Sequence, residues 1–250
     1  MLLSLMTGYA LATAIVGAAV FVDRVRYAGP SEQRVVLGSL ALAMAIGALA
    51  SGFLLRRFGV LVLSLVGIGL ATGGLVLLGT AGPTTELPVL LAGLALFGLG
   101  FGLTVTPRSS AAVEALGRRG YGIASAGVTV ARMAGMAVGL AVLTGFGTSR
   151  IEALSVVLTD AAARDAILPL ELVGRPLQDP QVIGALETWA SAEAASILGG
   201  IFLVAAVVML LGIIPTLWMR DPTSGRGRAT MPDDGSPSGD DDRIQPALSL

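Results

Sequence analysis

The chain alternates between long apolar stretches and shorter polar ones. Each apolar stretch is long enough for a helix to cross a hydrocarbon core of about 30 Å, which takes about 20 residues. Backbone groups in lipid must form their hydrogen bonds internally, and the sequence lacks the alternating pattern of a membrane β-barrel. The chain is therefore predicted to be an all-α membrane protein with six transmembrane helices, over residues 2–22, 35–55, 60–80, 88–106, 122–148 and 195–219.

The first stretch, residues 2–22, has the position of a secretory signal peptide. It lacks a basic segment before it, and its apolar run exceeds the usual length of about 7–15 residues. We therefore expect a retained first span and not a cleaved leader.

The connections between the spans differ in length and composition. Residues 149–194 are predicted to form a long, acidic external loop, with a short surface helix over residues 150–168 because apolar side chains recur there at helical spacing. The tail 222–250 is rich in Gly, Ser, Pro and Asp, which is typical of disorder. The sequence thus predicts one six-helix domain over residues 1–221, followed by a disordered cytoplasmic tail.

Arginine placement predicts the orientation in the membrane. Under the positive-inside rule, the side of the bilayer that receives more arginines is cytoplasmic. Both termini are then cytoplasmic in a multi-pass protein of the plasma membrane. The richer side holds Arg56, Arg57, Arg108, Arg118, Arg119, Arg220, Arg226 and Arg228, and the poorer side holds Arg24, Arg26, Arg34 and Arg150.

Composition excludes several classes of function. Hydrophobic residues make up 54% of the chain and charged residues 13%, about half the usual charged share. The chain contains no cysteine and no histidine, and its net charge is −1. The sequence therefore does not favour thiol chemistry, a metal centre or nucleic-acid binding. It contains no nucleotide-binding loop and no nucleophile–base pair, so we expect no cofactor and no enzyme.

Residues 29–59, GPSEQRVVLGSLALAMAIGALASGFLLRRFG, end in the pattern Gly-x-Leu-x-x-Arg-x-Gly. This pattern resembles the cytoplasmic loop motif of the major facilitator superfamily. Arg56 stands where that motif has an acidic residue, which puts the charge-relay role of the acid in doubt. The motif residues here are Gly52, Leu54, Arg57 and Gly59.

Residues 98–145 begin GLGFGLTVTPRSSAAVEAL and continue GRRGYGIASAGVTVARMAGMAVGLAVLTG. They resemble the fourteen-span drug:proton antiporter family, in its glycine-rich span, cytoplasmic linker and following span with an arginine before small residues. The resemblance implies the last six helices of such a transporter, one of two halves that enclose a central site. It further implies efflux of small amphipathic or drug-like compounds, with proton coupling through an N-terminal half that is missing here.

Arg132 is the sharpest candidate for chemistry, because it lies near the middle of the fifth predicted span. A mid-membrane arginine costs about 2.5–3.5 kcal/mol on insertion scales, so it should face protein or a water-filled cavity. No acidic residue lies inside any predicted span. Its partner is therefore a backbone carbonyl, a substrate or a carboxylate of the other half; a purely structural arginine is the alternative.

Other candidates lie at span ends or on helix faces. Asp23 and Glu193 are possible coupling acids at the external ends of the first and sixth spans, or simply mark where these helices leave the bilayer. Tyr9 and Thr13, and Phe97 and Phe101, line a substrate pathway or pack between helices. Gly-xxx-Gly spacing predicts close helix packing, at Gly69–Gly73, Gly98–Gly102 and Gly135–Gly139.

Two readings of function follow. In the first, the chain is half of a secondary transporter that works with its missing N-terminal half or as a homodimer. In the second, it is a non-transporting membrane scaffold or an inactive truncated transporter fragment, which Arg56 and the lack of acids within the spans favour.

Overall fold

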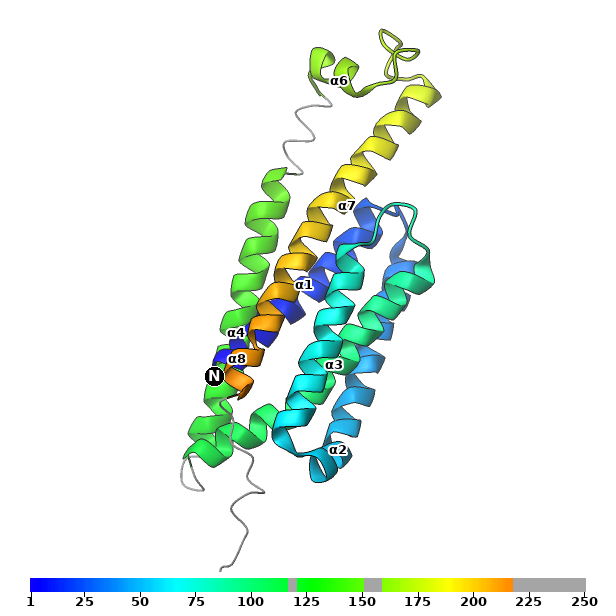
Figure 1. Cartoon of the computed structure of the whole chain (residues 1–250). Coiled ribbons are helices and arrows are strands. Elements are labelled where there is room, and N and C mark those ends of the chain that lie inside the picture. The colour runs from blue at the N-terminus through cyan, green and yellow to red at the C-terminus, as the bar shows by residue number, and fades with distance from the viewer. Residues whose placement is uncertain (117–120, 151–158, 218–250) are drawn as a thin grey trace, which may run out of the picture.

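The computed structural model describes residues 1–116, 121–150 and 159–217, which form long helices packed side by side (Figure 1). Within these residues there is no strand, and five helices are long and apolar enough to cross a membrane. An all-helical membrane protein with several spans is thus confirmed, while the count of six and the cytoplasmic termini stay predictions. The elements are α1 Leu2–Arg24, α2 Pro30–Gly79, α3 Leu87–Leu116, α4 Tyr121–Val142 with the π-helix η2 Leu143–Thr148, α6 Ala161–Ile167, α7 Pro180–Leu211 and α8 Ile213–Leu217.

Helix α2 consists of two arms, residues 30–58 and 60–79, that meet at Gly59 (φ 80°, ψ 170°). Both arms pack on the same part of α3. A Cβ added at Gly102 would lie 2.5 Å from the carbonyl oxygen of Met44, and one at Gly100 would lie 2.3 Å from the amide nitrogen of Ala71. In a straight helix Met44 and Ala71 would be about 40 Å apart. The chain therefore reverses direction at Gly59 (Figure 1).

Glycines also set the spacing between α1 and α4. A Cβ at Gly135 would lie 1.9 Å from the carbonyl oxygen of Leu5, and one at Gly139 would lie 2.7 Å from that of Tyr9. The predicted pair Gly135–Gly139 is therefore a site of close backbone contact, as is Gly98–Gly102 on α3.

The third predicted glycine pair, Gly69–Gly73, is wrong as a packing site. Gly69 faces open space, and a Cβ at Gly73 would meet only Leu96 at 3.5 Å. The face of the second α2 arm that touches α3 instead holds Gly67 and Gly74.

The two ends of the bundle hold different segments (Figure 1). We call the lower end the one with Met1, the reversal of α2 and α8, and the upper end the one with the connections 25–29 and 80–86 and with α6. The first and the last described residues therefore lie toward the same end.

Helix α7 begins at Pro180, inside the stretch predicted as an external loop, and not at Ala195. Asp179 caps it by accepting a hydrogen bond from the Gln181 amide, which holds the pKa of Asp179 below its usual range. Its 32 residues span about 48 Å, more than the hydrocarbon core of about 30 Å. Its first turns and α6 project above the rest of the bundle (Figure 1).

Several sequence predictions lie partly or wholly outside the described residues. Helix α6 lies within the surface helix predicted over residues 150–168, of which 151–158 are outside the described residues. The tail 222–250 also lies outside them, as do Arg118, Arg119, Arg220, Arg226 and Arg228.

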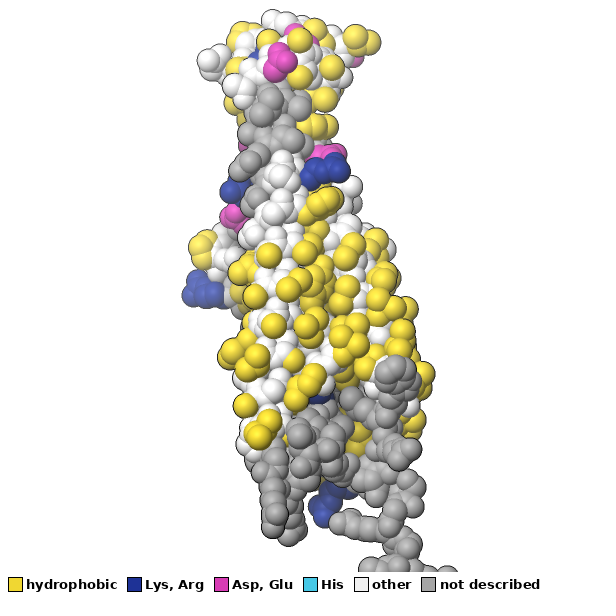
Figure 2. All heavy atoms as spheres, turned by 90° about the vertical axis from the view of Figure 1, so that its left-hand side faces the viewer, with side chains coloured by type: hydrophobic (Ala, Val, Ile, Leu, Met, Phe, Trp, Pro, Cys, Tyr) yellow, Lys and Arg dark blue, Asp and Glu magenta, His cyan; other side chains and the backbone are white. Residues whose placement is uncertain are grey.

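Large apolar side chains cover much of the outer surface. On the first arm of α2 they recur at helical spacing, with Leu49 72% and Phe53 78% exposed. Figure 2 shows a broad apolar face on the α4 side, with the acidic side chains of this view toward the upper end and arginines at both ends. A lipid environment accommodates such a surface, whereas in water it would drive association.

We expect Gly59→Ala to lower the free energy of unfolding by about 1–3 kcal/mol, because the backbone of Gly59 lies in a region that is essentially restricted to glycine. Gly52→Ala is the matched control from the same loop motif, since a Cβ at Gly52 meets nothing within 4 Å. Denaturant titration of the purified chain in detergent measures both, and equal stability of the two variants would contradict the assigned turn.

We expect Gly135→Ala to destabilise the protein by about 1–3 kcal/mol, since the new methyl group overlaps the backbone of α1. Gly69→Ala adds the same methyl group to an open helix face and should leave stability unchanged or raise it slightly. The same titration compares them. A neutral Gly135→Ala variant would mean that α1 and α4 are farther apart than described.

Candidate functional site

Arg108 is a charged side chain buried inside the bundle. It is 4% exposed and lies in α3, two helical turns after Phe101. Its Nη1 donates a hydrogen bond to Thr7 Oγ1 of α1, and its Cζ lies 5.6 Å from the centre of the Phe101 ring. Among the described residues its buried Nε has no hydrogen-bond partner. The sequence analysis placed Arg108 just after the predicted span 88–106, whereas α3 continues through Pro107 and carries Arg108 against α1.

Thr7 holds Arg108 in place from the first helix. Its side chain is fully buried, and its hydroxyl donates to the carbonyl oxygen of Ser4 at 3.0 Å. With its only proton used within α1, the hydroxyl oxygen is left to accept from Arg108. The contact joins two helices that are distant in the sequence.

Arg132 approaches the same place from α4. A Cβ at the neighbouring Gly8 would lie 2.1 Å from the carbonyl oxygen of Arg132, so α1 and α4 touch there. The Arg132 side chain is half-buried.

Among the side chains that the structure describes, no ion pair involves Arg108 or Arg132. The ion pairs there are Arg24–Asp23, Arg26–Glu32, Arg164–Asp165 and Arg175–Asp179, all outside the interior of the bundle. We call Arg108, Arg132 and Thr7 the arginine site. A buried guanidinium group with an unpaired nitrogen is suited to an acceptor that the described side chains do not supply.

The other predicted pathway residues are buried within the bundle. Thr13 donates its hydroxyl to the carbonyl oxygen of Tyr9, one turn earlier on α1. The rings of Phe97 and Phe101 are tilted by 37° with their centres 6.1 Å apart, and Phe101 also contacts Arg108 of the arginine site.

The predicted coupling acids lie far from the arginine site. Asp23 is exposed and pairs with Arg24 at 3.2 Å, sixteen residues from Thr7 on α1, or about 24 Å along the helix. Glu193 is half-buried on α7, before the apolar part of that helix.

The predicted loop motif forms the reversal of α2. Gly59 provides the left-handed backbone conformation, Leu54 is half-buried, and Gly52 and Arg57 are exposed. Arg57 lies over the Phe58 ring at 6.0 Å.

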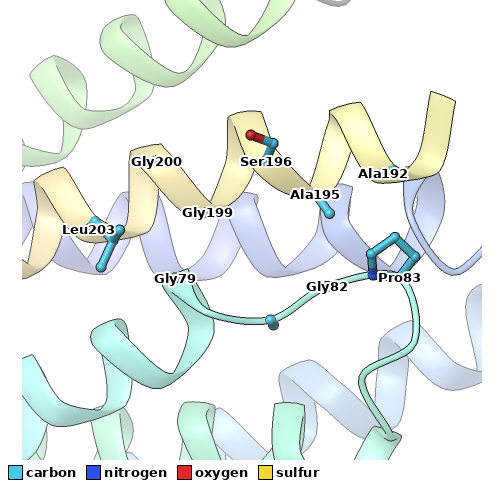
Figure 3. A pocket seen from close by; sticks show the side chains of 10 residues that line it. Gly79, Gly82, Pro83, Ala192, Ala195, Ser196, Gly199, Gly200 and Leu203 are labelled. Atoms are coloured by element: carbon cyan, nitrogen blue, oxygen red, sulfur yellow. The ribbon is translucent and has the colours of Figure 1, made fainter. Parts of the chain in front are cut away.

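A cavity of about 480 Å³ lies apart from the arginine site, between α7 and the connection from α2 to α3 (Figure 3). Its walls are small and apolar, with Gly79, Pro83, Ala195, Gly199 and Leu203 among them, and it is largely open to the outside. None of its lining residues is titratable. Over the described residues, no group of His, Cys, Asp or Glu has the arrangement of a metal site.

No family model matches this chain. It is 35% identical over 222 residues to a triacylglyceride transporter of Mycolicibacterium smegmatis, which covers 84% of this chain and 38% of that protein. It is 29% identical over 223 residues to a triacylglyceride transporter of Mycobacterium tuberculosis (84% and 41%), and 34% identical over 160 residues to one of Mycolicibacterium hassiacum (60% and 30%). The chain thus spans about two fifths or less of these relatives. These relatives are named as transporters and not as enzymes.

Thr7→Val should lower the free energy of unfolding by about 1–3 kcal/mol, because the valine side chain leaves a buried guanidinium donor of Arg108 unpaired. Thr13→Val is the control, since this equally buried hydroxyl bonds only within its own helix. Denaturant titration measures both variants. The assigned contact fails if the two variants are equally stable.

Proposed function

We propose that this chain is one six-helix half of a secondary active transporter of the major facilitator superfamily, which exports a lipid-like amphipathic compound across the plasma membrane. The observation that carries the proposal is the similarity to triacylglyceride transporters over 84% of the chain. This similarity favours apolar lipids as the substrate class over the drug-like compounds that the sequence resemblance implies. Drug-like molecules remain the second substrate class to test.

The low burial of α4 within this chain supports a second protein half that packs against it. In the most apolar window of each helix, 67% of the residues of α1 but 17% of those of α4 are buried within the chain. Helix α4 also carries Arg132, whose charge a lipid environment does not tolerate. A helix that combines an exposed apolar face with a charge is suited to face a second protein half, supplied by a longer chain, a separate chain or a second copy.

Proton coupling belongs to that second half in this proposal. Coupling needs an acid whose pKa burial shifts toward neutrality, and none of the ion pairs between described side chains involves Arg108 or Arg132. The motif turn at Gly59 and the placement of both described termini at the lower end agree with a half that starts and ends in the cytoplasm.

The test is reconstitution of the chain with a second half, after co-expression with the product of its chromosomal neighbour. Oligomeric mass in detergent shows whether the chain pairs, and transfer of a fluorescent triacylglyceride between the leaflets of vesicles shows transport. Arg132→Ala should lower the transport rate by about tenfold, or about 1.4 kcal/mol, while Arg34→Ala, an exposed arginine at the upper end, should keep it.

The outcomes separate the two readings. Pairing with lipid transfer that depends on Arg132 supports the half-transporter. A chain that stays monomeric with every candidate partner and moves neither lipid nor drug-like probes supports the membrane scaffold or inactive fragment.

A further inference from the structure

We propose that the cavity between α7 and the connection from α2 to α3 binds one acyl chain of a membrane phospholipid. Its volume of about 480 Å³ lies within the range of about 300–1,000 Å³ that is typical of ligand sites. The one polar side chain among the residues that line it is Ser196, and none of the lining residues is charged. An ordered water needs about two to four polar partners, so these walls are suited to an apolar occupant and not to water.

The walls of the cavity meet where the backbones of α2 and α7 touch. A Cβ added at Gly199 would lie 2.7 Å from the carbonyl oxygen of Gly79, the last residue of α2. Figure 3 shows Ala195 and Leu203 on the side of α7 that faces the connection, which carries Pro83. Two elements that are distant in the sequence therefore enclose the cavity.

The chain itself holds the wall formed by the connection in place. Residues 82–85 form a turn, in which the Thr85 amide donates to the carbonyl oxygen of Gly82 at 3.0 Å and the Gly82 amide donates to Thr85 Oγ1 at 2.8 Å. Arg26, which pairs with Glu32, donates from Nη1 to the carbonyl oxygen of Thr85 at 2.7 Å. Because this wall is already ordered, a ligand binds without the entropic cost of ordering it.

The cavity lies at the depth of the lipid acyl chains in the leaflet at the upper end. The second arm of α2, residues 60–79, is about 30 Å long, which is one crossing of the hydrocarbon core. On α7 the lining residues extend from Ala192 to Leu203, about 17 Å along the helix, so the cavity reaches from the upper boundary of the core into it. Exposed apolar side chains continue from there at helical spacing, at Leu203, Val207 and Leu210. The open side of the cavity is therefore continuous with the surface that the helices present to lipid.

The cavity faces away from the helix that the proposed function assigns to a second protein half. Ile201 of α7 faces the α4 side, because its Cδ1 lies 3.7 Å from a Cβ placed at Gly147 of η2. Gly199 and Leu203 of the cavity are each two residues from Ile201, or about 200° around the helix. A site on this outer side is not enclosed between two halves, as a transported compound would be. The occupant is therefore the acyl chain of a resident membrane phospholipid and not the cargo.

The test uses the full purified chain in phosphatidylcholine nanodiscs that contain a small fraction of phosphatidylcholine with a photoreactive diazirine on one acyl chain. After illumination, digestion and mass spectrometry locate the labelled residues. The reference is the exposed apolar surface of residues 42–53 in the first arm of α2. We expect the label per exposed residue on the two cavity walls, residues 79–83 and 192–203, to exceed this reference by about fivefold, as about one or two additional buried methylene groups would give.

Gly200→Phe fills the cavity from α7 and should remove this excess. A Cβ at Gly200 meets nothing within 4 Å, so the larger side chain starts into open space. Gly69→Phe is the matched control and should leave the excess unchanged, since Gly69 is an exposed glycine with equally open surroundings outside the cavity. If circular dichroism shows that Gly200→Phe disturbs folding, the labelling pattern of the wild-type protein decides alone.

Three results would overturn the proposal. Equal labelling of the cavity walls and of residues 42–53 would show ordinary lipid contact and no site. An equal loss in Gly69→Phe and Gly200→Phe would show that added bulk acts unspecifically. Stronger labelling of the cavity walls by a triacylglyceride with the same diazirine chain, at equal mole fraction, would assign the cavity to the proposed cargo. Labelling is read without transport or pairing, so this proposal and the proposed function can fail separately.

Discussion

The close approach of α1 to α4 is the contact on which the rest of the arginine site depends. Gly8, Gly135 and Gly139 bring the two backbones together. Helices in lipid gain no hydrophobic energy from pairing, so van der Waals contact at small residues must hold them. Thr7 adjoins Gly8 and Arg132 lies opposite it, so the glycines decide which polar groups of α1, α3 and α4 meet.

Arg108 in the arginine site has good local contacts, but no described side chain neutralises its positive charge. A hydrogen bond to Thr7 and an aromatic ring stabilise Arg108, and a desolvated cation over a ring is worth about 2 kcal/mol. Neither supplies a negative charge. Burial makes an uncompensated charge more costly, because the effective dielectric constant falls away from water. The site therefore has an energetic reason to take up an anion.

The sequence predicted the helices well where one physical rule dominates. Apolar length alone marks the membrane helices, and the motif ending in Gly59 marks the reversal of α2, since only glycine adopts that backbone conformation easily. The start of α7 at Pro180 was missed because the polar residues before Ala195 resemble a loop, although Asp179 followed by Pro180 is a helix-start signal. The contact of Arg108 was missed because the predicted span ends at residue 106, and only tertiary packing shows that α3 continues through Pro107 and meets Thr7.

Charge compensation differs between the two ends of the bundle, and this difference suggests where an outside group must act. At the upper end Arg26 contacts both Glu32 and the carbonyl oxygen of Thr85, so the chain neutralises its own charge and ties two connections together. Toward the lower end, Arg108 is buried, and its described side-chain contacts are the neutral Thr7 and Phe101. Arg26 is thus neutralised within the chain, whereas no described side chain neutralises Arg108. A group from outside the described residues that binds Arg108 should therefore act where α1 and α3 meet.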